Sequence, residues 1–269
     1  MPKNIITGSV ALPGGDRSFR YARFGDGARA FVILPGIAMK NVVDDAPAVA
    51  EAYRAFTEEH GYTGYLLDRA EPLHDGYRIE DMAEDTAFVM QTLGIREADV
   101  FGASQGGMIG LVLAAKHPEL VRRLVAGSSS GKIEGTAETV LRRWTEIAER
   151  HDHRTLNHEM FRALYSEELL ASLGDALETL ENAGDAAGCD RLAVLTKACI
   201  GFDCLDLAAG LGDKVFVIGA GEDRVLGAEA SARLAERIGC GYYLYEHGTH
   251  AVYDEAPDYK DRLLAFFRS

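Results

Sequence analysis

Ser104 stands in the run Phe101-Gly102-Ala103-Ser104-Gln105-Gly106-Gly107, with a glycine two residues away on either side. A serine on a tight turn from a strand to a helix adopts strained backbone, which makes its hydroxyl project from the sheet edge. Gly102 and Gly106 lack the Cβ atoms that would collide across such a turn. A helix N-terminus below the turn adds a partial positive charge. The spacing therefore predicts a nucleophilic serine, and the alternative is a serine that only caps a helix.

A serine hydroxyl needs a general base with a pKa near 7, and histidine is the natural choice. Among the eight histidines, His250 follows the last apolar run, in Gly248-Thr249-His250-Ala251-Val252. This position predicts a loop at the same sheet edge as Ser104. His247, three residues earlier, is the rival, and we interpret it as structural or surface-exposed. The other histidines fall in helices or loops without a matching partner.

The base in turn needs an acid that fixes its tautomer and stabilises the imidazolium. Asp223 follows an apolar run that ends at Ile218, and Glu222 beside it is the alternative. The predicted catalytic residues are therefore Ser104, Asp223 and His250, as nucleophile, acid and base.

An oxyanion that forms during the reaction needs hydrogen-bond donors. One expected donor is the backbone N–H of Gln105, the residue after the nucleophile. The second is expected from the loop after Leu34, and we predict the N–H of Ile37. Gly36 would let this backbone approach a substrate closely, whereas the simpler interpretation of Pro35-Gly36 is an ordinary turn.

Strands and helices alternate along the chain and would position these residues. Continuous apolar runs are typical of strands buried on both faces of a parallel sheet. Helical patterns between them indicate βαβ units and an α/β fold with an open, mostly parallel sheet. Two short runs around Pro13-Gly14-Gly15-Asp16 predict a β-hairpin at the sheet edge. The predicted strands are Ala30–Leu34, Thr63–Leu67, Ala98–Gly102, Arg123–Ala126, Lys214–Ile218 and Tyr242–Tyr245, and the predicted helices include Ala48–Glu59, Met108–Lys116, Leu226–Ile238 and Tyr259–Phe267.

The segment from 131 to 209 breaks this alternation, because its pattern is helical throughout. Some 80 residues without a strand are too many for one crossover. We therefore predict a helical cap at 131–209 over a core made of 1–130 and 210–269. Among the aromatic residues of this segment, the candidates for the pocket wall are Trp144, Phe161, Tyr165 and Phe202, although aromatic residues at helical spacing are more often core.

Composition excludes some classes of partner. The formal charge of −14 disfavours nucleic acid and anionic membrane surfaces. We see neither a signal peptide nor a membrane-spanning apolar run, so a cytoplasmic location is expected. The four cysteines form no Cys-x-x-Cys pair, which makes a metal cluster improbable. The expected partner is a small-molecule substrate, and a homo-oligomer is left open.

At these motifs the chain resembles the α/β-hydrolase family over nearly its whole length. The resemblance rests on Ser104-Gln105-Gly106-Gly107-Met108, His117-Pro118-Glu119-Leu120-Val121 and the loops that carry Asp223 and His250. It implies a twisted sheet of about eight strands flanked by helices, a helical cap and no cofactor. Two departures concern the pocket: Pro35-Gly36 stands where the family often has His-Gly, and the loop from Asp68 keeps only the start of the family's glycine-rich pattern.

These features predict a serine hydrolase that cleaves a small carboxylic ester or lactone through an acyl-enzyme intermediate. A C–C bond hydrolase or a peptidase would use the same three residues. A receptor-like member with slow turnover and an acyltransferase with an acceptor other than water are further alternatives.

Overall fold

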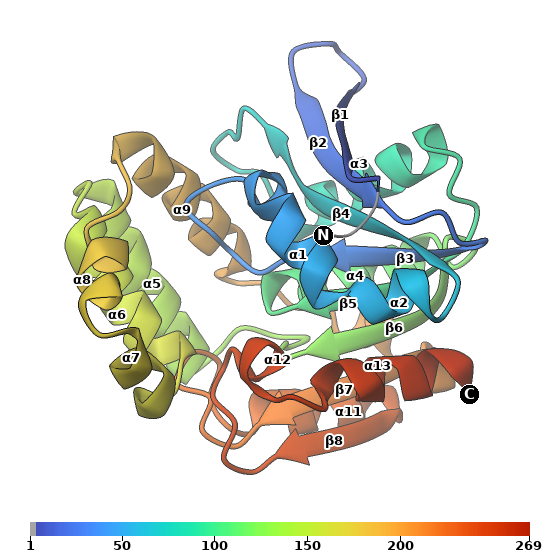
Figure 1. Ribbon diagram of the computed structural model, residues 1–269. Coiled ribbons are helices and arrows are strands. Elements are labelled where there is room, and N and C mark those ends of the chain that lie inside the picture. Colours follow the sequence, from blue (N-terminus) through green and yellow to red (C-terminus); the bar gives the residue numbers. More distant parts are fainter. Residues whose placement is uncertain (1–3) are drawn as a thin grey trace.

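The structure, a computed structural model, describes residues 4–269. Its centre is one eight-stranded sheet with the strand order β1-β2-β4-β3-β5-β6-β7-β8 (Figure 1). Strands β3 to β8 run parallel to one another, β1 and β2 form the predicted antiparallel edge hairpin, and β2 also pairs antiparallel with β4. The strands are β1 (Ile6–Ala11), β2 (Ser18–Phe24), β3 (Arg29–Leu34), β4 (Tyr62–Glu71), β5 (Ala98–Ala103), β6 (Val121–Gly127), β7 (Val215–Ala220) and β8 (Gly241–Tyr245).

Helices cover both faces of this sheet, and each face has its own core. One core holds buried residues of α3, α4 and α11, and the other those of α1, α2, α12 and α13. The central strand β5 is buried along its whole length, as expected for a parallel strand between two helical layers. The flanking helices are α1 (Ala46–Ala52), α2 (Arg54–Glu58), α3 (Ile79–Thr92), α4 (Gln105–Lys116), α11 (Ala230–Ile238), α12 (Val252–Glu255) and α13 (Tyr259–Arg268), with the 3-10 helices η1 (Val42–Asp45) and η2 (Gly212–Lys214).

Six helices lie between β6 and β7, in the segment predicted to be helical. In Figure 1 most of them form a separate lobe beside the sheet. Among the described residues, the segment that holds these helices has one isolated β-bridge. It joins Lys132 to Asp203, near the two ends of the segment. They are α5 (Thr136–Glu149), α6 (His153–Leu164), α7 (Glu167–Leu173), α8 (Asp175–Glu181), α9 (Ala186–Cys199) and α10 (Leu205–Ala208).

Three predicted boundaries were wrong. Strand β4 does not end at Leu67 but continues through Asp68 and Arg69 to Glu71. The predicted helix Ala48–Glu59 is two helices, because the backbone of Tyr53 leaves helical geometry while its ring packs against those of Phe31 and Phe56.

The third error concerns the start of α11. The helix begins at Ala230 and not at Leu226. The N–H groups of Val225 and Leu226 instead donate hydrogen bonds to Asp223 Oδ1, both at 2.8 Å. These bonds fold residues 223–226 into a turn, which holds Asp223 at the end of β7.

Candidate active site

Ser104 lies at the junction of β5 and α4, where the chain turns sharply. Its φ of 53° and ψ of −118° belong to a region that non-glycine residues rarely adopt. The neighbouring strand supports this conformation, because Ser104 N donates to Gly127 O at 2.8 Å. Ser129 Oγ donates to Ser104 O, also at 2.8 Å. The strained backbone is therefore held by hydrogen bonds and presents the hydroxyl beyond the carboxyl end of the sheet.

The glycines around Ser104 are required for close packing of backbone. A Cβ on Gly102 would lie 2.4 Å from Gly106 O, and one on Gly106 would lie 2.0 Å from Leu34 O. Backbone atoms cannot yield as a flexible side chain can, so a side chain at either position would force strand and helix apart. The sequence spacing thus reflects a turn in which β3, β5 and α4 come into contact.

His250 and Asp223 form a buried hydrogen-bonded pair. His250 Nδ1 lies 2.8 Å from Asp223 Oδ2, and the two side chains are 1% and 3% exposed. Asp223 Oδ1 is occupied by the N–H groups of the 223–226 turn. With its carboxylate fixed in this way, Asp223 holds the imidazole with Nε2 free for another partner.

The rival residues lie elsewhere. His247 is 91% exposed, and its ring contacts Glu222 at 3.3 Å. His247 lines a shallow surface hollow formed with β8 and α12, and not the cavity that contains Ser104. Of the two histidines and two acids considered for these roles, His250 and Asp223 form the pair that is buried at the end of the sheet.

Ser104 and His250 line one cavity of about 370 Å³ between the sheet and the helical segment. Most of its wall is apolar, and residues of α5, α6 and α9 contribute to it as well as residues of the β3–α1 loop. Among the candidates for the pocket wall, Gly36, Trp144 and Tyr165 line this cavity. Burial raises the pKa of Tyr165 to about 12, so its hydroxyl stays neutral at physiological pH.

The other two aromatic candidates do not line it. Phe161, on α6, packs its ring 6.3 Å from that of Tyr165. Phe202 lines a separate hollow together with Tyr77 and Arg78. Both positions agree with the simpler expectation that aromatic residues at helical spacing belong to packing layers.

The loop after β3 passes directly beside Ser104. A Cβ on Gly36 would lie 3.4 Å from Ser104 Cβ, and Ile37 follows in the cavity wall. Gln105 is the first residue of α4, so its N–H faces the same end of the sheet. The two N–H groups predicted as oxyanion donors therefore come from segments that flank the serine.

A buried polar network behind this site was missed from the sequence. The Gln105 side chain donates to Leu195 O at 2.7 Å and to Cys199 Sγ at 3.1 Å, and accepts from Arg69 Nη2 at 2.7 Å. Burial raises the pKa of Cys199 to about 11. The sequence did carry one signal of the network, since Asp68 and Arg69 interrupt an otherwise apolar run.

A metal site is not formed by the described residues, since no group of three or more His, Cys, Asp or Glu side chains in 4–269 is arranged to hold an ion. Within the same range, no helix is long and apolar enough to cross a lipid bilayer.

Comparison with known proteins places this geometry in a family. The family profile described as the alpha/beta hydrolase fold matches residues 57–257, which is most of the chain. The chain belongs to the α/β-hydrolase fold family. The family match includes Ser104, Asp223 and His250, and the resemblance expected from the sequence is confirmed, as is the eight-stranded fold.

Relatives of known name extend over most of the chain. It is 25% identical, over 82% of its length and 85% of the relative's, to a protein of Rhizobium rhizogenes named provisionally as the carbamate hydrolase RutD. The enol-lactonase of Burkholderia xenovorans superposes with a TM-score of 0.83 at 19% identity and covers 97% of this chain and 100% of its own. The hydrolase MGS-M2 from a deep-sea metagenome gives a TM-score of 0.85 at 19% identity, with coverages of 97% and 98%. The family match and the RutD relationship support a hydrolase activity, and the two superpositions support the fold.

Proposed function

We propose that this α/β-hydrolase cleaves small carboxylic esters or lactones through an acyl-enzyme intermediate. The observation that carries the proposal is the strained Ser104, which lines one apolar cavity with His250 while His250 is hydrogen-bonded to the buried Asp223. A serine and a histidine that open into one cavity, with the histidine held by an acid, are the groups that nucleophilic catalysis needs.

In this reaction Ser104 Oγ attacks the substrate carbonyl carbon while His250 Nε2 takes the hydroxyl proton. The carbonyl oxygen becomes an oxyanion, which the N–H groups of Gln105 and Ile37 stabilise. The tetrahedral intermediate then collapses, and the leaving alkoxide receives the proton from His250. Water, deprotonated by the same imidazole, attacks the acyl-enzyme and releases a carboxylic acid and free Ser104.

We propose that residues 131–209 act as a cap over a core of 1–130 and 210–269. Support comes from the cavity wall, to which the helical segment contributes Leu141, Trp144, Met160, Leu164 and Tyr165. The cap also contacts the histidine loop, because Ala251 N donates to Leu164 O at 2.8 Å. A wall of this kind would select substrates by the size and polarity of their acyl groups.

The charge of the cavity wall favours neutral or cationic substrates. Among the described residues that line it, Asp45 and Asp254 are acidic and none is Lys or Arg. A substrate carboxylate would therefore find no Lys or Arg to pair with in the wall and would be repelled by Asp254, whereas Asp45 pairs with Lys40 at 2.8 Å.

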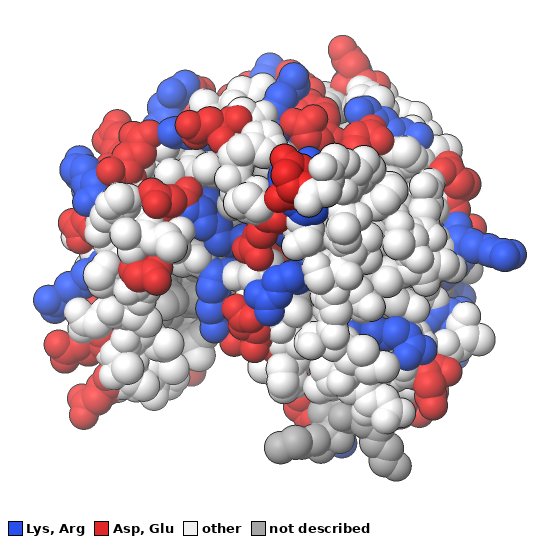
Figure 2. Space-filling view, turned by 90° about the horizontal axis from the view of Figure 1, so that it is seen from above, with Lys and Arg blue, Asp and Glu red and all other residues white. Residues whose placement is uncertain are grey.

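The wider surroundings support the same proposal of a small-molecule enzyme. All four cysteines are free thiols, as in a reducing compartment, and we propose a cytoplasmic location. The face in Figure 2 mixes acidic and basic residues and is hollowed between the helical lobe and the sheet-bearing body. With a net charge of −14, nucleic acid is not a proposed partner.

The test is hydrolysis of p-nitrophenyl acetate, butyrate and octanoate by wild type and by Ser104→Ala. We expect kcat/KM to fall roughly 10⁴-fold or more in the variant. Activity that survives the substitution would show that Ser104 is not the nucleophile. A wild type as slow as Ser104→Ala would reject ester hydrolysis and direct the assay to C–C, amide or carbamate substrates, the last because of the resemblance to RutD.

A further inference from the structure

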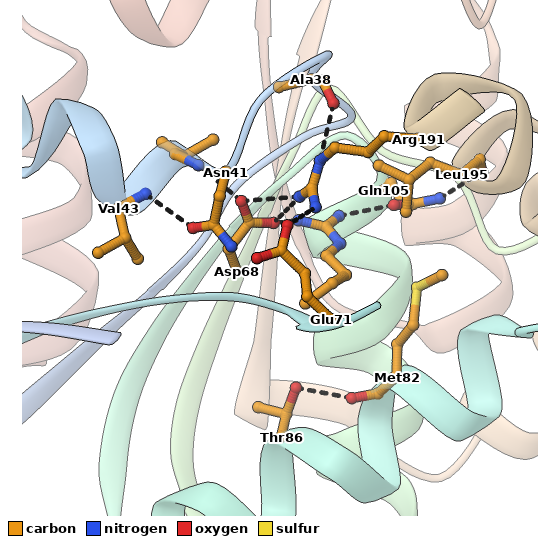
Figure 3. Close-up of polar contacts among 12 residues, drawn as sticks. Ala38, Asn41, Val43, Asp68, Glu71, Met82, Thr86, Gln105, Arg191 and Leu195 are labelled. Carbon is orange, nitrogen blue, oxygen red and sulfur yellow. Dashed lines mark hydrogen bonds and ion pairs between the residues drawn. The ribbon is translucent and has the colours of Figure 1, made fainter. Parts of the chain in front are cut away.

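Three charged side chains are buried together between the sheet, the β3–α1 loop and helix α9 (Figure 3). Asp68 and Arg69 come from β4 and are 1% and 0% exposed, while Arg191 comes from α9 and is 8% exposed. Asp68 contacts both guanidinium groups: Arg69 Nη1 at 3.1 Å, and Arg191 Nη2 at 2.9 Å from each carboxylate oxygen. Buried charges are costly, so such a cluster persists only where its members are held by one another.

The first link from this cluster leads to the nucleophile turn. Arg69 Nη2 donates to the side-chain oxygen of Gln105 at 2.7 Å, and the Gln105 amide nitrogen donates to Leu195 O on α9. Burial lowers the pKa of the Arg69 guanidinium, and the Asp68 carboxylate opposes that shift. The side chain of Gln105, whose backbone N–H is one proposed oxyanion donor, is thus held by Arg69 of β4 and by Leu195 of α9.

The second link leads to the loop that offers the other donor. Arg191 Nε donates to Ala38 O at 3.2 Å, which fixes the carbonyl of the residue directly after Ile37. Asp68 Oδ2 accepts from Val42 N at 2.7 Å, which ties down the end of the same loop. Arg191 Nη1 also donates to Glu71 at 2.6 Å, so all three nitrogens of the guanidinium group make hydrogen bonds.

We propose that Arg191 is a positioning residue, through which the docking of cap helix α9 sets the geometry of the oxyanion hole. Its guanidinium joins α9 to the loop of Ile37 directly and to Gln105 through Asp68 and Arg69. When α9 moves away from β4, the Ala38 carbonyl and the Asp68 carboxylate lose a partner, and both donors lose their alignment. The proposal rests on the proposed function, because it assigns a role within that same site.

A misplaced donor affects the transition state more than the bound substrate, which makes the role measurable. The carbonyl oxygen gains its charge only as the tetrahedral intermediate forms, so a loosened oxyanion hole lowers kcat and leaves KM nearly unchanged. A phenylboronic acid reports the same geometry at equilibrium, because its boron binds the serine oxygen and carries a hydroxyl into the oxyanion hole.

The experiment compares Arg191→Gln and Arg191→Lys with wild type. It measures kcat and KM for p-nitrophenyl butyrate and, separately, the affinity for phenylboronic acid. For Arg191→Gln we expect kcat and boronate affinity to fall together by about 10²-fold, with KM within about threefold of wild type. Arg191→Lys retains the charge opposite Asp68 but lacks the planar fork, so an intermediate loss is expected. If Arg191→Gln does not fold, the comparison between Arg191→Lys and wild type decides the question in the same way.

Lys197→Gln is the matched control, since Lys197 lies on α9 and its one ion pair among the described residues is with Glu149 at the surface. It should behave as wild type. Folded Arg191 variants with wild-type kcat and boronate affinity would overturn the proposal, as would losses that equal the loss of folded protein. Failure of the proposed function has a different signature, because wild type itself would then neither hydrolyse the ester nor depend on Ser104.

Discussion

His250 Nδ1 and Asp223 Oδ2 lie 2.8 Å apart, and both side chains are almost completely buried. In the proposed mechanism, this carboxylate holds the tautomer in which Nδ1 carries the proton and Nε2 accepts one from Ser104. Asp223→Asn replaces one carboxylate oxygen with an amide and disturbs this tautomer. We expect a loss of about 10⁴-fold in kcat with an unchanged fold, measured by steady-state kinetics and circular dichroism.

Glu222→Gln is the control for this substitution. Glu222 is the neighbouring acid, and within residues 4–269 its side chain forms a polar contact with the exposed His247 alone. The activity of Glu222→Gln should remain within about twofold of wild type, as is usual for a substitution of an exposed residue. A larger loss in Glu222→Gln than in Asp223→Asn would exchange the roles of the two acids.

The pH profile should have an acid limb and then a long plateau. Catalysis by a general base gives an activity that falls at acidic pH. Burial raises the pKa of Cys199 from 9.0 to about 11 and that of Tyr165 from 10.0 to about 12. A raised pKa keeps each group neutral to higher pH, so the cavity wall gains no negative charge in the assay range. We expect kcat/KM to stay constant between about pH 8 and pH 10.

Cys199→Ala tests whether the thiol shapes that profile. Its kcat/KM should be constant over the same pH range, whatever its absolute activity, because the wild-type thiol stays protonated there. A descending limb near pH 9 in wild type that disappears in Cys199→Ala would show that the thiol ionises after all.

Two glycines near Ser104 should respond differently to the same added methyl group. A Cβ at Gly106 would meet Leu34 O at 2.0 Å, whereas one at Gly36 meets Ser104 Cβ at 3.4 Å, an ordinary contact. Gly106→Ala should lower the free energy of unfolding by about 3 kcal/mol. Gly36→Ala should fold normally but lose about tenfold in kcat/KM, because its methyl group lies where the substrate carbonyl must approach.

Thermal unfolding and kinetics of both variants separate these outcomes. A Gly36→Ala protein with wild-type activity would show that the loop after β3 does not contact substrate, and would remove the reason for assigning Ile37 to the oxyanion hole. A stable Gly106→Ala protein would contradict the close approach of α4 to the end of β3.

The sheet and the placing of Ser104 at the end of a central strand could be anticipated from the sequence because both depend on local patterns. Apolar runs mark buried strands, and glycine spacing marks the turn at Ser104. The partners within the buried network could not be anticipated, since Asp68, Arg69 and Arg191 are charged and such residues are usually exposed. Their burial depends on the meeting of β4 with α9, which are separated by more than a hundred residues. Local periodicity carries no information about such a contact.

The charge of the cavity wall predicts a substrate preference. Asp254 lines the cavity beside Tyr165 and Tyr253. Burial raises its pKa and Lys260 opposes that shift. Asp45, the second acid of the wall, pairs with Lys40 at 2.8 Å. We expect 4-nitrophenyl esters with a trimethylammonium-tipped acyl chain to be cleaved at least as fast as the isosteric tert-butyl ester. A carboxylate-tipped ester should be roughly tenfold slower.

The same three esters with Asp254→Asn identify the source of the preference. Removal of this charge should raise kcat/KM for the anionic ester and lower it for the cationic one, while the neutral ester remains within about twofold, since a charge in the wall acts on charged substrates alone. Glu51→Gln removes an exposed acid of α1 that lies outside the cavity wall and should leave all three ratios unchanged. Equal rates for the three esters in wild type would show that the wall does not discriminate by charge, and that the cap selects by shape alone.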